Sequence, residues 1–170
     1  MAKLGVLPSL KALYESVSIS EVVYGDVVVK GRQKEYTEVY FIEKTIEEKF
    51  LRVETLSKES RKLADELATF LGLGEAQSIA LCLQERADVL LVDDERARRA
   101  SGHLGVKWAT TLDVLFALLL EEKLTMKKYE ELITQHASQA WVEPELVREY
   151  LEKARAVRRT DPLNPGNGGD

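Results

Sequence analysis

The chain has 170 residues, of which 45% are hydrophobic and 31% are charged, and its formal net charge is −5 at pH 7. These values are typical of a soluble globular domain that buries its own core, and the net charge argues against broad, nonspecific binding of polyanions. A single cysteine, Cys82, excludes an intrachain disulfide. No apolar run approaches the roughly 18 residues of a membrane span, and the N-terminus lacks a signal-peptide core. A cytoplasmic location is therefore expected.

The first part of the chain is predicted to alternate helices with short strands. Leucines at three-residue intervals indicate a helix face with Pro8 in its first turn, and alternation of apolar and polar residues later indicates a strand. Hydroxyl side chains before two of the helices are suitable N-caps, and Gly31 is a suitable helix end. The predicted order is a helix over Leu4–Tyr14, a strand over Val17–Ser20, helices over Glu21–Lys30 and Thr37–Lys49, a strand over Leu51–Leu56, and a helix from Ser57 or Ser60 to Leu71.

The stretch from Gly72 to Leu115 has the pattern of βαβ units. A helix through Gln84 leads into the apolar run of Asp88–Asp94, which is predicted to be a buried strand, and a charged helix over Glu95–His103 leads into a second strand over Val106–Thr111. Open α/β sheets place their sites at the carboxyl ends of parallel strands. Acidic residues at those positions are therefore the first candidates for chemistry.

The last part of the chain is predicted to be helical until a polar tail. The predicted helices cover Leu112–Glu122, Thr125–Gln135 and Pro144–Val157. The residues after Val157 are rich in Gly, Pro and Asn and have no apolar pattern, so a disordered tail is expected. The expected organisation is one domain over residues 1–157 and a tail over residues 158–170.

Two acidic residues can meet at the edge of the predicted sheet. Glu75 begins a helix and Asp93 ends a strand, and carboxylate oxygens are the ligands that Mg²⁺ and Mn²⁺ prefer. Each residue also has an ordinary structural explanation. An acid in the first turn of a helix interacts with the helix dipole, and Asp93-Asp94 before a helix can be an N-cap.

Several motifs in order resemble the PIN-domain superfamily, and more narrowly a prokaryotic PIN-like family of unknown function related to VapC-type toxin ribonucleases. The resemblance rests on Gly74-Glu75-Ala76, on the run from Asp88 to Arg98 with its Asp93-Asp94 pair, and on Thr110-Thr111. The segment from Ile19 to Val28 resembles the second motif of that family.

This resemblance implies a three-layer α/β/α domain with a parallel sheet and four acidic positions around one or two Mg²⁺ or Mn²⁺ ions. The second position falls on Asp26, the third on Glu75, and the fourth on Asp93 with Asp94 beside it. Asp26 stands where the family usually has Glu, which shortens its reach by one methylene. The resemblance further implies RNA as substrate, a small antitoxin protein as partner, and a homodimer.

The first acidic position has no counterpart in the chain. PIN domains begin with a strand that ends in Asp, whereas Ala2-Lys3-Leu4-Gly5 resembles the helix that follows it. A PIN-like domain without its first strand is therefore expected. A start codon placed too late, a truncated gene and a protein that no longer cleaves RNA are all open explanations, and a partner or a second copy could supply the strand.

Two further side chains are candidates for substrate contact. Arg96 can hold an RNA phosphate, or it can belong to a solvated helix with Glu95 as a partner for its arginines. Thr111 can orient water or phosphate, or it can cap the next helix. The leading hypothesis is a metal-dependent endoribonuclease of the toxin–antitoxin type, impaired by the missing strand. The alternative is a non-catalytic PIN-like module for protein interaction.

Overall fold

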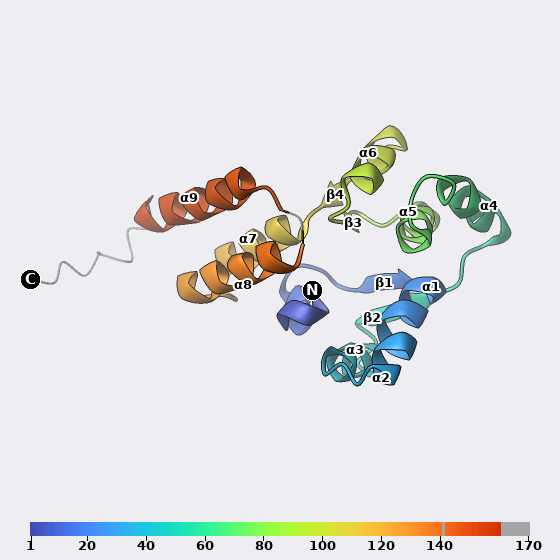
Figure 1. Cartoon of the computed structure of the whole chain (residues 1–170), viewed down its shortest axis with the longest axis horizontal. Helices are drawn as coiled ribbons and strands as arrows, with labels where there is room; N and C mark the ends of the chain where they lie inside the picture. The colour runs from blue at the N-terminus through green and yellow to red at the C-terminus, as the bar shows by residue number, and fades with distance from the viewer. Residues whose placement is uncertain (141, 161–170) are drawn as a thin grey trace, which may run out of the picture. The chain divides into compact units, whose positions relative to one another are not determined.

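The computed structural model describes residues 1–140 and 142–160. The chain divides into two compact units, of which the first is Met1–Thr111 and the second begins at Leu112. The α/β class predicted from the sequence is confirmed, because parallel strand pairs are embedded in a helix-rich chain (Figure 1). Most of the predicted tail lies outside the described residues.

The first unit begins with two short 3-10 helices instead of the single helix predicted there. These are η1 (Ala2–Leu4) and η2 (Leu7–Ala12). Gly5 lies between them in the left-handed conformation, with φ 69°, which ends the first turn. Pro8 stands at the start of η2, as predicted.

The first parallel pair is formed by β1 (Val17–Ser20) and β2 (Leu51–Glu54), with Val17 opposite Leu51 and Ser20 opposite Glu54. Both strands were predicted, although β2 ends two residues earlier than expected. The crossover between them contains a continuous helical stretch, followed by a separate helix. Its elements are α1 (Glu21–Tyr24), the π-helical turn η3 (Gly25–Val29), α2 (Lys30–Gln33) and α3 (Glu38–Glu47).

Gly31 does not end the helix, so the prediction at this residue is wrong. The helical stretch continues to Gln33, and Gly31 is buried inside it. A Cβ atom at Gly31 would lie 2.6 Å from Cγ2 of Val39 at the start of α3. The glycine therefore allows α3 to approach the preceding helix closely.

In the next part of the unit, two helices pack against each other. Ser57 caps α4 (Lys58–Leu67), where its Oγ accepts a hydrogen bond from Ser60 N at 3.1 Å, and α5 (Leu73–Glu85) packs beside α4 (Figure 1). The chain continues through β3 (Leu90–Leu91), α6 (Glu95–His103) and β4 (Trp108–Ala109). The buried side chains that hold these elements together are Leu67, Leu71, Ala76, Ile79, Cys82, Leu90, Ala97 and Val106.

The second strand pair is also parallel, with Leu90 opposite Trp108 and Leu91 opposite Ala109. In the described part of the chain, the β1–β2 and β3–β4 pairs are two separate ladders and do not form one continuous sheet. Both ladders belong to the first unit.

The described residues of the second unit form helices and their connections. Its elements are α7 (Thr111–Leu120), α8 (Met126–Gln139) and α9 (Pro144–Thr160). Tyr129 of α8 is fully buried, and its hydroxyl donates a hydrogen bond to the carbonyl of Tyr150 in α9 at 3.2 Å. The ring of Phe116 in α7 lies 6.4 Å from that of Tyr129 and 6.3 Å from that of Tyr150, between centroids. An aromatic cluster thus joins the three helices.

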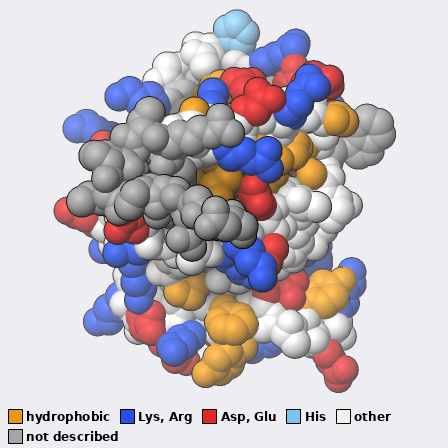
Figure 2. All heavy atoms as spheres, turned by 90° about the vertical axis from the view of Figure 1, so that its left-hand side faces the viewer, with side chains coloured by type: hydrophobic (Ala, Val, Ile, Leu, Met, Phe, Trp, Pro, Cys, Tyr) orange, Lys and Arg blue, Asp and Glu red, His pale blue; other side chains and the backbone are white. Residues whose placement is uncertain are grey.

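The surface carries charges of both signs. On the face seen in Figure 2, Lys and Arg side chains are intermingled with Asp and Glu, and hydrophobic side chains are exposed between them. None of the helices in the described part of the chain is long and apolar enough to cross a membrane.

Candidate functional site

Polar side chains follow each strand of the first unit. Ser20 ends β1 and Thr55 follows β2, while Asp93 lies beyond β3 and Thr110 beyond β4. Within each pair the strands are parallel, so their carboxyl ends share one edge. This is the location at which α/β proteins usually build sites.

Asp93 is held by Thr111, which lies across the second strand pair. The backbone N–H of Thr111 donates to Oδ1 of Asp93 at 2.7 Å, and the Thr111 hydroxyl donates to Oδ2 at 2.7 Å. Thr111 is buried, with 7% of its surface exposed. These two bonds fix the plane of the carboxylate, so Thr111 acts as a positioning residue for Asp93.

The amino group of Met1 also lies near Asp93. Burial lowers the pKa of this amine, and the Asp93 carboxylate raises it by a smaller amount. The hydrogen bonds that fix the Asp93 carboxylate come from Thr111.

Asp94 has a different role from its neighbour in sequence. It is the N-cap of α6, and its Oδ1 accepts a hydrogen bond from Ala97 N at 2.8 Å. The capping explanation considered for the Asp93-Asp94 pair thus describes Asp94.

Glu75 lies in the first turn of α5, and its side chain folds back over the N-cap residue Gly72. A Cβ atom at Gly72 would lie 2.2 Å from Oε2 of Glu75, so the glycine makes room for the carboxylate. Within residues 1–140 and 142–160, no hydrogen bond or ion pair holds this carboxylate. A Cβ atom at Gly74 would lie 3.7 Å from Cγ2 of Val23, which shows that the start of α5 packs against α1.

Asp26 lies in the π-helical turn of the first crossover. Its Oδ1 forms an ion pair with Nζ of Lys30 at 2.5 Å, and 51% of the Asp26 side chain is exposed. Single π-helical turns occur often at functional sites. An exposed ion pair of this kind contributes only about 0–1 kcal/mol of stability.

The arginines of α6 have three different environments. Arg99 pairs with Glu95 at 2.5 Å, and the guanidinium carbon of Arg98 lies 5.2 Å from the centre of the Trp108 ring. Arg96 has no ion pair among the described residues, and it lines an open groove of the first unit. Arg96 is exposed on α6, so its contact with an RNA phosphate stays a prediction.

The acidic residues do not assemble a metal site in the arrangement observed. In the part of the chain that the structure describes, no group of three or more His, Cys, Asp or Glu side chains is arranged to hold a metal ion. Asp26, Asp93 and Asp94 each have a protein partner. These residues as they stand do not fit a complete Mg²⁺ or Mn²⁺ site.

One acidic residue at the carboxyl end of the β1–β2 pair was not among the predicted site residues. Glu21 directly follows β1, and its Oε1 accepts a hydrogen bond from the hydroxyl of Thr55, which directly follows β2, at 3.1 Å. The available signal was the position of Glu21 after a predicted strand, which is also the position of Asp93.

Cys82 is a buried thiol. It is free, only 8% exposed, and burial raises the pKa of its thiol. A raised pKa keeps the thiol protonated and unreactive near neutral pH.

Comparison with known proteins identifies the family. A family model described as a PIN domain matches residues 1–156, which is most of the chain. No curated protein and no solved structure matches the sequence. The match confirms the resemblance to PIN domains and suggests a fold of nuclease type, while the narrower relation to VapC-type ribonucleases stays a prediction. On the motifs, the parallel strand pairs and this match, the chain belongs to the PIN-domain family.

Proposed function

We propose that this protein is an endoribonuclease of the PIN type and that its active edge includes Glu75 and Asp93. The observation that supports the proposal is the PIN-domain match over residues 1–156. Within it, Glu75 lies in the first turn of α5 and Asp93 lies two residues beyond β3. The substrate is RNA, as the family suggests in general.

The two carboxylates are suited to different tasks. Asp93 accepts two hydrogen bonds from Thr111, so its position is fixed before any ligand arrives. Glu75 has no such bond among the described residues, and an uncommitted carboxylate can accept a proton from water or bind a cation. Asp26 and Asp94 are weaker candidates. Asp26 forms an ion pair with Lys30, and Asp94 caps the N-terminus of α6.

Mg²⁺ or Mn²⁺ is the cofactor that we propose for this edge. The existing contacts are weak competitors for a divalent ion, since an exposed pair such as Asp26–Lys30 contributes about 0–1 kcal/mol. An N-cap such as Asp94 contributes about 1 kcal/mol. The described residues do not bring three ligands together. The cleavage experiment therefore compares reactions with and without a divalent ion.

Cleavage of RNA by the purified chain tests the proposal. Structured and unstructured RNAs are incubated with Mn²⁺, Mg²⁺ or a chelator, with the Asp93→Asn variant and with Asp88→Asn as a matched control, because Asp88 lies before β3. We expect cleavage that requires a divalent ion, that Asp93→Asn abolishes and that Asp88→Asn leaves intact. Cleavage that Asp93→Asn does not change would reject the assignment.

The second candidate is a non-catalytic module for protein interaction. It is favoured by the engagement of Asp26, Asp93 and Asp94 with protein groups. Calorimetric titration with Mn²⁺ separates the two candidates. Tight binding that Glu75→Gln abolishes would remove most support for the non-catalytic module, whereas absence of binding would favour it.

We also propose a toxin–antitoxin role, with a small antitoxin protein as partner, and a homodimer. Light scattering tests the homodimer directly. A particle of twice the chain mass of 19.2 kDa supports it, and a monomer at all concentrations contradicts it.

A further inference from the structure

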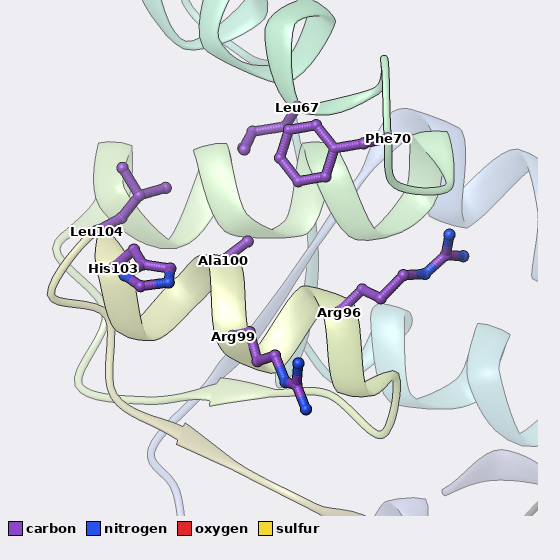
Figure 3. A pocket seen from close by; sticks show the side chains of 7 residues that line it. All are labelled: Leu67, Phe70, Arg96, Arg99, Ala100, His103 and Leu104. Carbon is purple, nitrogen blue, oxygen red and sulfur yellow. The ribbon is translucent and has the colours of Figure 1, made fainter.

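An open groove of about 490 Å³ lies in the first unit, between the end of α4 and the outer face of α6 (Figure 3). Its floor is apolar. Leu67 and Phe70 come from the α4 side, and Ala100 faces them from α6. At one end of the groove, Leu104 adds a fourth apolar side chain.

Two of these apolar side chains are exposed to solvent. Phe70 is 53% exposed and Leu104 is 39% exposed, although Leu67 beneath them belongs to the buried core. Clustered exposed apolar side chains on a folded domain commonly mark an interaction surface. The exposure also means that the groove is open on one side, which suits a side chain of a docked segment better than an enclosed small molecule.

The ionisable side chains that line the groove are all basic. They are Arg96, Arg99 and His103. Arg96 has no ion pair within the described residues, and Arg99 is paired only with Glu95 of its own helix, in an exposed contact. The groove therefore combines an apolar floor with a basic border, and its charge is complementary to an acidic ligand.

These features favour a peptide over a nucleic acid. Proteins that bind single strands use several aromatic side chains in succession along a basic channel. The floor of this groove is mainly aliphatic, and its aromatic side chains are Phe70 and His103. A bulky side chain that fills a desolvated pocket is a common anchor of protein interfaces. Acidic neighbours of such an anchor would complement the basic border of the groove.

We propose that the α4–α6 groove docks an acidic segment of a partner protein through one bulky apolar side chain. The apolar anchor would contact Phe70 and Leu104, and the acidic residues would pair with Arg96 and Arg99. This inference does not depend on the proposed nuclease activity, because it uses neither Glu75 nor Asp93.

Fluorescence anisotropy with designed peptides tests the inference on the whole chain. The probe is a fluorescein-labelled peptide, Glu-Asp-Leu-Phe-Asp-Glu, compared with a peptide that has lysine for every acid and one that has alanine for Leu-Phe. We expect saturable binding of the first peptide only. Phe70→Ala and Arg96→Glu should each weaken binding about tenfold, which corresponds to about 1.4 kcal/mol.

Lys62→Glu is the matched control for Arg96→Glu. Lys62 lies on α4 outside the groove, is exposed and makes no ion pair in the described part of the chain, so the substitution changes the net charge by the same amount. It should leave peptide affinity within about twofold. Phe70 is largely exposed, so Phe70→Ala should leave the fold intact, and circular dichroism checks this.

Three results would overturn the inference. The first is no saturable binding of the acidic peptide, and the second is equal binding of the lysine peptide. The third is binding of a labelled single-stranded RNA that Arg96→Glu abolishes and Phe70→Ala leaves unchanged, which would assign the basic border to nucleic acid.

Discussion

Hydrogen bonds fix the carboxylate of Asp93, whereas none in the described residues fixes that of Glu75. Substitutions of the two residues therefore give different information. Both oxygens of Asp93 accept hydrogen bonds from Thr111, so an amide at this position would turn one acceptor into a donor that faces a donor. Loss of activity in Asp93→Asn would then combine chemistry with a local structural cost. Glu75 has no such bond in the described residues, so Glu75→Gln is the cleaner probe.

Substitution of Gly31 by alanine tests how closely α3 packs against the preceding helix. In Gly31→Ala the new Cβ would lie 2.6 Å from Cγ2 of Val39, which is closer than atoms can pack. Overpacking of this kind costs about 1–3 kcal/mol, and the better helix propensity of alanine returns about 1 kcal/mol. We expect the free energy of unfolding to fall by up to about 2 kcal/mol, measured by urea denaturation.

Gly25→Ala is the matched control in the same helical stretch. Gly25 has helical dihedrals, and a Cβ atom there would meet nothing within 4 Å. The free energy of unfolding should rise by up to about 1 kcal/mol. Equal effects of the two substitutions would show that the close approach of α3 at Gly31 does not exist.

At the scale of elements, Gln84 ties α5 to the connection between β2 and α4. Its Oε1 accepts from Ser57 N at 2.8 Å, and its Nε2 donates to the carbonyl of Thr55 at 3.1 Å. Gln84→Ala should lower the free energy of unfolding by about 1–2 kcal/mol, since each lost bond costs about 1 kcal/mol.

The same substitution at Gln77 controls for side-chain removal on α5. The Gln77 side chain makes no hydrogen bond in the described part of the chain, so Gln77→Ala should change stability by less than about 0.5 kcal/mol in the same urea denaturation. A Gln84→Ala variant as stable as Gln77→Ala would contradict the tie between these elements.

Local signals in the sequence were sufficient to predict many of the helices and strands. The helix Glu95–His103 has the predicted bounds, because Asp94 caps it and glycines surround its end. Ser57 caps α4 as expected. Gly31 was misassigned because its role depends on α3, which approaches it in space, and a local pattern does not contain that contact.

The candidate site could be predicted in part for the same reason. The positions of Glu75 at a helix start and Asp93 after a strand are local features, and both were identified. The bond between Asp93 and Thr111 joins residues 18 apart and depends on the register of β3 and β4. Such pairing requires the folded strands, so the sequence left several roles open for Thr111.

At the scale of the whole molecule, the acidic edge and the aromatic cluster belong to different units. The carboxylates discussed above lie within Met1–Thr111, whereas Tyr129 and Tyr150 lie in the unit that begins at Leu112. Asp113 of that unit accepts a hydrogen bond from the hydroxyl of Tyr150, which gives it a structural role. A substitution in the aromatic cluster should therefore change the free energy of unfolding.

The pH dependence of unfolding tests the aromatic cluster. Burial, with a smaller effect from the nearby Tyr150, raises the pKa of Tyr129 above its ordinary value. The folded chain then keeps a proton that an unfolded tyrosine loses near pH 10, so stability should fall as the pH rises above about 10. Tyr129→Phe should cost about 1 kcal/mol at pH 7 through the lost bond to the Tyr150 carbonyl.

Tyr129→Phe should also lose less stability between pH 8 and pH 11 than the parent chain, since it has no phenol at this position to ionise. Urea denaturation across this range measures the difference. Identical pH profiles of the two proteins would show that Tyr129 ionises equally in the folded and unfolded states.

The rate of RNA cleavage by Glu75→Gln is the most direct test of the proposed active edge. Glu59→Gln is its control, because Glu59 is also an acid in the first turn of a helix, so both variants lose the same dipole interaction. The account predicts that Glu75→Gln abolishes cleavage in the presence of Mn²⁺ while Glu59→Gln cleaves like the parent chain. Equal cleavage by both variants would contradict it.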